Sequence, residues 1–139
     1  MAFPDTDNDV SGVIAAAVGS LVLGENMFLG ARRGYADGVI PHKAVFVLAD
    51  GGQQSRNLHG YADERHPRVE VRVRSDPPGV AGAFQAGQSL ARAVFEAVHL
   101  NPPAGYCDSV TTDSAPSYEG VDEDGHHEWI VYVDLIVDA

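Results

Sequence analysis

Residues 66–100 decide the fold and read HPRVEVRVRSDPPGVAGAFQAGQSLARAVFEAVHL. Valines alternate with charged residues from Val69 to Arg74, which is the period-two pattern of a strand with one buried face. After the Pro-Pro-Gly sequence at 77–79, apolar residues recur at steps of three and four, so they share one face of a helix. That face consists of Val80, Ala83, Phe84, Gly87, Leu90, Ala91, Val94 and Val98. The stretch predicts a strand and a helix that pack together, with Gly87 allowing a close approach.

The rest of the chain supplies partners for this unit. Thr6 as N-cap, followed by an apolar stripe as far as Leu21, predicts a first helix beside the second one. Further strands are predicted at 26–31, 43–48, 106–112 and 126–137. The run at 43–48 is apolar almost throughout, which is typical of a strand buried on both faces. The polar stretch 53–65 is predicted to be an extended loop or arm.

These elements predict the fold class. Residues 1–139 form a single two-layer α+β domain, with a mostly antiparallel sheet of about four to five strands and two helices on one face. The longest apolar run, residues 13–23, is too short to span a bilayer, and no basic segment precedes an apolar one at the amino terminus. We therefore expect neither a membrane span nor a secretory signal. The single cysteine, Cys107, excludes an internal disulfide bond.

The charges are divided unevenly along the chain. Residues 30–75 hold eight of the nine basic residues and five acidic ones, a net charge of +3. Residues 76–139 hold one basic residue and eleven acidic ones, a net charge of −10. One interpretation is an acidic solvated surface, and the other is a molecule with a positive and a negative side that pairs head-to-tail with its own copies. So acidic a domain is poorly suited to binding nucleic acid.

The last predicted strand is apolar on both of its faces. Trp129, Val131, Val133, Leu135 and Val137 point one way and are expected in the core. Ile130, Tyr132 and Ile136 point the other way, together with Asp134. Three large apolar side chains are unusual on a solvated face. In so small a domain they predict a second covered surface, which we interpret as a contact with another subunit.

Candidate catalytic groups are few. Residues 122–128 read DEDGHHE and concentrate possible metal ligands, but His126 and His127 are neighbours on a strand and should point to opposite faces. The sequence therefore predicts no catalytic residues, no metal site and no cofactor. The alternative is a metal-dependent hydrolase that uses Asp122, His126 or His127, and Glu128.

Three segments resemble a known protein family. They are the strand Val69–Ser75, the segment 114–126 with its Pro-x-Tyr-x-Gly-x-Asp pattern, and the closing strand His127–Asp134. The order of elements and these segments resemble the tail terminator and minor capsid proteins of long-tailed bacteriophages. The resemblance covers most of the chain from Ala44 onward. The family often has a basic residue after the hairpin glycine, where this sequence has His126.

The resemblance implies a structural virion protein and not an enzyme. Members of the family form a hexameric ring that caps the completed tail tube and stops its polymerisation. The ring also presents a surface to the connector of the head, and the genome DNA passes through its channel without specific binding. Expected partners are thus further copies of the chain, the tail tube protein and a head-completion or connector protein. The location would be the virion at the head–tail interface, after synthesis in the host cytoplasm. A different ring protein of the same virion, either a head-completion or a tail tube protein, is the alternative.

The two uneven charge regions predict where subunits meet. The basic patch is expected on the sheet face away from the helices, and the acidic patch on a hairpin that projects from the domain. The predicted interface residues are Glu70, Arg72, Arg74, Asp122, Glu123, Asp124, Ile130, Tyr132 and Ile136.

Overall fold

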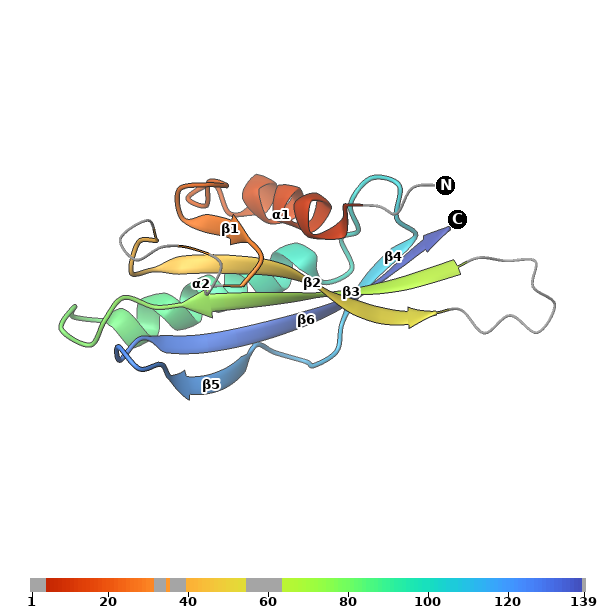
Figure 1. The fold of residues 1–139 in the computed structure, drawn as a ribbon. Coiled ribbons are helices and arrows are strands. Elements are labelled where there is room, and N and C mark those ends of the chain that lie inside the picture. Colours follow the sequence, from red (N-terminus) through yellow and green to blue (C-terminus); the bar gives the residue numbers. More distant parts are fainter. Residues whose placement is uncertain (1–4, 32–34, 36–39, 55–63, 139) are drawn as a thin grey trace.

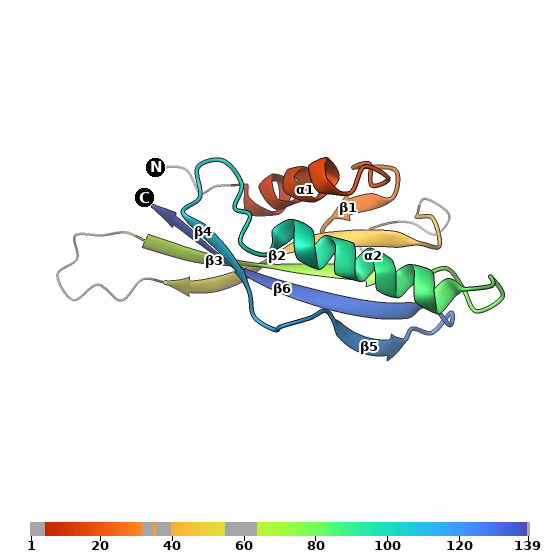
Figure 2. The same ribbon diagram turned by 180° about the vertical axis from the view of Figure 1, so that it is seen from behind.

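The computed structural model describes residues 5–31, 35, 40–54 and 64–138. The elements follow in the order α1 (Thr6–Ala17), β1 (Met27–Leu29), β2 (Ala44–Gln54), β3 (Glu64–Arg74), α2 (Ala83–Val98), β4 (Asp108–Thr111), β5 (Ser117–Val121) and β6 (His127–Asp138). Both helices lie on one face of a six-stranded sheet, as the views from the two sides show (Figures 1 and 2). The predicted two-layer α+β fold is confirmed. No helix in the described part of the chain is long and apolar enough to cross a membrane.

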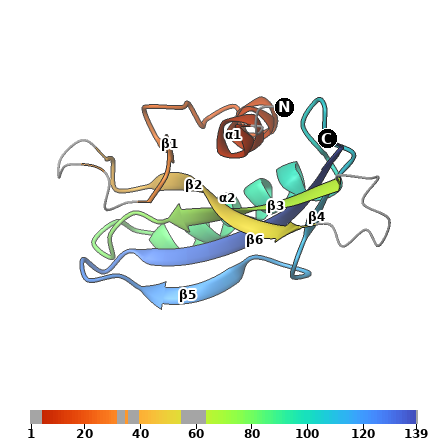
Figure 3. The ribbon, with the colours of Figure 1, turned by 45° about the vertical axis from the view of Figure 1, so that its right-hand side comes forward.

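The sheet is built around β6. The strand order is β1-β2-β3-β6-β4, and β5 also pairs with β6. One edge of β6 pairs with β3, while the other edge pairs first with β5, at residues 127–130, and then with β4, at residues 133–136 (Figure 3). All these pairings are antiparallel, and β1 alone among the described strands runs parallel to its neighbour, β2. The paired ends of β2 and β3 extend beyond the helical layer (Figure 2).

The main core lies between the helices and the sheet. In the middle parts of β2, β3 and β6 alternate residues point into it, as the alternation of valines predicts. Its buried members are Val10, Ile14, Leu21, Met27, Val45, Val47, Val69, Val71, Val73, Ala91, Val94, Val98, Trp129, Val131, Val133 and Leu135. Gly87 of α2 lies so close to the sheet that a Cβ atom there would be 2.6 Å from Cζ3 of Trp129. The predicted close approach at Gly87 is therefore confirmed.

A second, smaller core lies on the opposite face of the sheet. Ala44 and Phe46 alternate with the core valines of β2 and are buried with Phe28 of β1. Tyr35 and Ile40 pack against this group, and the Tyr35 ring lies 5.1 Å from the Phe28 ring, centroid to centroid. The prediction that 43–48 is buried on both faces is confirmed for residues 44–47, because part of the chain between β1 and β2 covers the far side, whereas Lys43 is exposed and Leu48 is half-buried.

Three local predictions were wrong. Thr6 lies inside α1, with Asp5 at the N-cap position and no side-chain cap, because the Thr6 side chain is buried near the hydroxyl of Tyr106. Helix α2 begins at Ala83, since Gly82 has a left-handed φ of 74° that a helix cannot include, and Val80 is exposed. Strand β5 was not among the predicted strands. Of the predicted arm at 53–65, residues 53–54 and 64–65 belong to β2 and β3, and 55–63 lie outside the described residues.

Candidate interaction surface and the β5–β6 turn

The sheet face opposite the helices carries most of the predicted interface residues. Cross-strand pairing places Glu70 beside Tyr132, Arg72 beside Ile130, and Arg74 beside Glu128. Because the intervening valines are fully buried in the main core, these side chains lie on the other face, as predicted. Hereafter this surface of β3, β6 and β4 is called the outer face.

Ion pairs within the chain already use the basic residues of the outer face. Arg72 bridges two carboxylates, with Nη1 2.9 Å from Glu128 and Nη2 3.1 Å from Glu70. Burial alone would lower the pKa of Arg72, but these two partners raise it above its ordinary value. Arg68 pairs with Asp134 at 2.9 Å, and its guanidinium lies 5.8 Å from the centroid of the Tyr132 ring. Arg68 and Arg72 are thus bound to neighbours on the same sheet before any second subunit is considered.

Arg74 does not form part of an exposed basic patch. It is only 6% exposed, and it donates hydrogen bonds to the carbonyl oxygens of Pro41, at 2.6 Å, and His42, at 2.8 Å. These bonds hold the segment before β2 against the end of β3. We therefore correct the sequence prediction for this residue: Arg74 acts within the fold, because burial removes its guanidinium from contact with another subunit.

The apolar residues of the outer face differ in their exposure. Ile130 lies between Arg72 and Ser117 of the neighbouring strands and is 5% exposed, so the chain itself buries it. Tyr132 and Ile136 are half-buried, and Val110 of β4, next to Asp134, is exposed. Burial and the carboxylate of Glu70 raise the pKa of Tyr132 above its ordinary value. The open part of the outer face is therefore the part toward β4.

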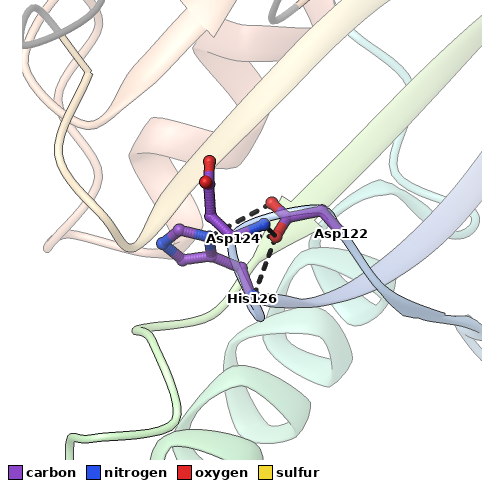
Figure 4. Close-up of side chains that lie close together, drawn as sticks. All are labelled: Asp122, Asp124 and His126. Carbon is purple, nitrogen blue, oxygen red and sulfur yellow. Dashed lines mark hydrogen bonds and ion pairs between the residues drawn. The ribbon is translucent and has the colours of Figure 1, made fainter.

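The predicted acidic hairpin is the turn between β5 and β6. Asp122 closes it, because its Oδ1 accepts hydrogen bonds from the backbone N–H groups of Asp124 and His126, both at 2.9 Å (Figure 4). Its carboxylate also lies 3.1 Å from Nδ1 of His126. Burial raises the pKa of Asp122, but these hydrogen bonds outweigh it, so the pKa lies below its ordinary value. Glu123 and Asp124 are exposed and project from the domain, whereas Asp122 is a structural part of the turn.

Metal binding by this turn is limited by the same hydrogen bonds. One ligand atom each from Asp122, Asp124 and His126 lie within 4.8 Å of one another. Asp122, however, is committed to two backbone N–H groups and to His126, so a cation would compete with the bonds that close the turn. Nothing in this geometry requires a metal. The absence of a metal site stays a prediction.

His126 has a partner that lies 84 residues away in the sequence. The side chain is almost fully buried, and its Nε2 lies 3.1 Å from Nδ1 of His42. His127 points elsewhere, with Nδ1 2.8 Å from the hydroxyl of Tyr118 and its ring against Phe84, as the alternation of a strand predicts. Sequence reasoning missed the His42–His126 pair, because no spacing relates two residues that only the fold brings together.

Sequence reasoning also missed an exposed apolar patch beside the turn. Phe84 and Tyr118 form it and are 37% and 47% exposed, and Val80 and Val121, near them in the sequence, are exposed as well. The rings of Phe84 and Tyr118 meet edge to face at 5.7 Å. Helical spacing had predicted Val80 and Phe84 as core residues, and the late start of α2 and the presence of β5 explain the difference.

No protein-family model matches the sequence, and no curated protein matches it either. The functional assignment therefore depends on the sequence segments and on the geometry described above.

Proposed function

We propose that this chain is a structural protein of a long-tailed bacteriophage, a tail terminator that forms a ring on the end of the tail tube. The observation that carries the proposal is the placement of the three segments on which the family resemblance depends. The first segment lies before α2, and the other two adjoin each other after β4, yet together they form β3, β5 and β6, three adjacent strands of one sheet. The resemblance is thus concentrated in one continuous part of the sheet, which supports the proposal.

The Pro-x-Tyr-x-Gly-x-Asp segment has a structural explanation that fits this role. Tyr118 and Gly120 flank a shift in the β5–β6 register, and Gly120 has a φ of 96°, which a residue with a side chain rarely adopts. Asp122 then closes the turn into β6. These residues shape a bulged edge strand and its turn. Their roles support a protein whose motif residues maintain a surface rather than perform a reaction.

The open part of the outer face is the surface that we assign to the neighbouring subunit. It combines the half-buried side chains of Tyr132 and Ile136 with exposed Val110 and the Arg68–Asp134 ion pair. In a closed ring each subunit presents two different surfaces, so this face would meet a second region of the next copy. The exposed carboxylates Glu123 and Asp124 would then be free to face other virion partners or the DNA channel.

The proposal can be tested with the phage and with the purified chain. In a phage that lacks this gene, we expect electron microscopy to show tails of irregular, excessive length that are not joined to filled heads. The purified chain should form rings with six subunits, as measured by sedimentation and by class averages of negatively stained particles.

The alternative ring proteins give different phenotypes in the same experiment. Loss of a head-completion protein would leave tails of normal length beside heads that have lost DNA, and loss of a tube protein would leave no tails at all. Either result would replace the terminator assignment with the corresponding one. A chain that stays monomeric and whose loss leaves complete virions would contradict a structural role in the tail.

A further inference from the structure

We propose that the open edge of β5 is a docking site for another protein, which adds to it an extended segment where Lys or Arg alternates with apolar residues. Strand addition of this kind takes its affinity from backbone hydrogen bonds and its specificity from alternate side chains. The docking site does not depend on the proposed function, because an open edge can accept a strand in a ring and in a monomer alike.

Strand β5 has one free edge. It pairs with β6 on one side, and none of the other described strands lies along its opposite side, where it borders the sheet (Figures 1 and 3). The five residues of β5 are half-buried or exposed. The backbone N–H and C=O groups that point to the free side therefore have no strand partner in the described part of the chain, which makes this edge a template for one more strand.

The bulge in β5 brings its two apolar side chains to the same face. Tyr118 lies opposite Trp129, and Val121 lies opposite His127. Trp129 and His127 share the face that α2 covers. In a regular strand, residues three apart point to opposite faces, so the register shift at Glu119 re-aims Val121. An added strand would therefore meet two exposed apolar side chains on the helical face.

Phe84 of α2 completes an aromatic anchor beside this edge. Its ring lies 5.7 Å from the ring of Tyr118, and both rings lie 5.4 Å from buried Trp129, centroid to centroid. The hydroxyl of Tyr118 is 2.8 Å from Nδ1 of His127, which fixes the ring before a partner binds. A pair of exposed rings that is already held in place loses little conformational freedom on binding, so it suits an apolar side chain of a partner strand.

The charges around the edge select a basic partner. Residues 112–125 hold five acidic residues and no lysine or arginine. Glu119, Glu123 and Asp124 are exposed, and no cation among the described residues forms an ion pair with them. Glu119 accepts a hydrogen bond from the hydroxyl of Ser117, at 3.0 Å, on the face away from the helices. A Lys or Arg that alternates with the apolar residues of the partner would point to that face.

A second copy of the chain does not fit this edge. Pairing of β5 with β5 of another copy would bring like charges together, which destabilises a strand pair. The basic strand of the chain, β3, is paired with β2 on one side and with β6 on the other, so it has no free edge to offer. The same carboxylates would repel the phosphates of a nucleic acid. The edge therefore suits a different protein with a basic extended segment.

The experiment uses the full chain and a synthetic peptide, Lys-Val-Arg-Ile-Lys-Val-Arg, at about 0.15 M salt, where charges are screened beyond about 8 Å. Fluorescence anisotropy of the labelled peptide measures the affinity, and hydrogen exchange read by mass spectrometry locates the site. We expect a dissociation constant below about 1 mM and slower amide exchange at 117–121, but not at β1, the opposite edge of the sheet. A peptide with Glu in place of each Lys and Arg should not bind.

Two N-methylated peptides separate strand addition from simple attraction of charges. The N–H groups of successive residues in a strand point to opposite edges, so methyl groups on the apolar residues block one edge of the peptide. Methyl groups on the basic residues block the other edge. One of the two peptides should bind like the parent, and the other should lose its binding. If both bind equally, or if neither binds, no strand is added and the proposal is wrong.

Two substitutions in β5 test the residues involved. Glu119→Lys should weaken binding about three- to tenfold, because an attraction becomes a repulsion. Tyr118→Ser should weaken it about tenfold, because the aromatic anchor is lost. Glu96→Lys is the matched control, since it makes the same charge change at an exposed residue of α2, about 18 Å along the helix from Phe84. This control should keep the affinity of wild type.

Three results would overturn the docking site. The first is no binding at about 1 mM peptide. The second is equal weakening by Glu119→Lys and Glu96→Lys, which would mean that only the overall charge attracts the peptide. The third is protection of 117–121 that rises with the concentration of the chain itself when no peptide is present, because the edge would then belong to a second copy.

Discussion

Gly87 fixes how closely α2 approaches the sheet. A Cβ atom at this position would be 2.6 Å from Cζ3 of Trp129 and 2.8 Å from Cβ of Ser75, and both of these residues are buried. We expect Gly87→Ala to destabilise the fold by about 1–3 kcal/mol, because overpacking outweighs the gain in helix propensity. Urea unfolding measures the change.

Gly12 of α1 provides the matched control. It is also in a helix, but no atom lies within 4 Å of a Cβ built there. Gly12→Ala should therefore stabilise the fold by about 0.4–1 kcal/mol, since only the propensity term remains. Equal effects of the two substitutions would show that the contact with Trp129 does not set the helix position.

Tyr106 connects the region before β4 to the first helix and should make stability sensitive to alkaline pH. Its hydroxyl donates a hydrogen bond to Oδ2 of Asp9, at 2.7 Å. Burial, reinforced by Asp9, raises the pKa of Tyr106 to about 12. Between pH 10 and 12 the unfolded chain loses this proton before the folded one, so the free energy of unfolding should fall as the pH rises.

Tyr106→Phe should remove that part of the loss of stability at alkaline pH. At neutral pH, where the hydrogen bond is intact, the substitution should lower the free energy of unfolding by on the order of 1 kcal/mol. Urea midpoints of wild type and Tyr106→Phe between pH 8 and 12 measure both effects. Tyr118→Phe, at an exposed tyrosine, serves as the control. If the urea midpoints of wild type and Tyr106→Phe fall in parallel as the pH rises, Tyr106 is not the cause of the alkaline loss of stability.

At the scale of elements, Arg72 and Arg74, two residues apart on β3, should differ sharply in how much their substitution destabilises the fold. Arg74 is buried and holds two backbone carbonyls, while the Arg72 side chain is 34% exposed and makes ion pairs at the surface. Arg74→Met should destabilise the fold by roughly 2–4 kcal/mol, because the carbonyls lose charged donors. Arg72→Met should cost about 1 kcal/mol or less. Similar urea midpoints for the two variants would contradict the anchoring role of Arg74.

The elements that the sequence predicted well are those whose pattern follows from local geometry. Alternating valines identified β3, helical spacing identified α2, and the apolar run identified β2 as buried on both faces. Strand β5 was missed because its residues, SYEGV, contain a bulge at Glu119 and Gly120 and are mostly exposed, so no period-two pattern remains. Arg74 looked like the third member of an exposed charged row, and only the fold shows that the segment before β2 covers it.

In the candidate sites too, features that follow from local geometry were predictable and features that depend on long-range packing were not. The directions of His126 and His127 were predictable, since neighbours on a strand point apart. The partner of His126 was not, because His42 reaches it through long-range packing. Ile130 was correctly placed on the outer face but is buried by its own chain, which a single sequence cannot indicate.

For the molecule as a whole, the decisive substitution is at Tyr132. It belongs to the open part of the outer face, so Tyr132→Asp should dissociate the proposed ring while the monomer still unfolds cooperatively. Sedimentation velocity measures assembly, and urea unfolding measures the fold. Charge reversal of Arg72 is less informative, because it would leave three carboxylates together and would disturb the sheet itself.

Leu100→Asp is the control for this experiment. Leu100 is 64% exposed and has a φ of 55°, a conformation that aspartate tolerates, so the substitution adds the same charge at little structural cost. It should leave both the ring and the fold intact. A ring that survives Tyr132→Asp would mean that the outer face is not the subunit contact.

The position of β6 in the sheet has a consequence for synthesis on the ribosome. This strand emerges after every other described element, yet it joins β3 to both β4 and β5. Until it emerges, β3 has an unpaired edge, and the apolar sides of Val69, Val71 and Val73 lack one neighbour. Nascent chains that end before residue 127 should therefore be captured by chaperones. The domain should fold slowly once β6 has emerged, because its central pairing is also its most distant in sequence.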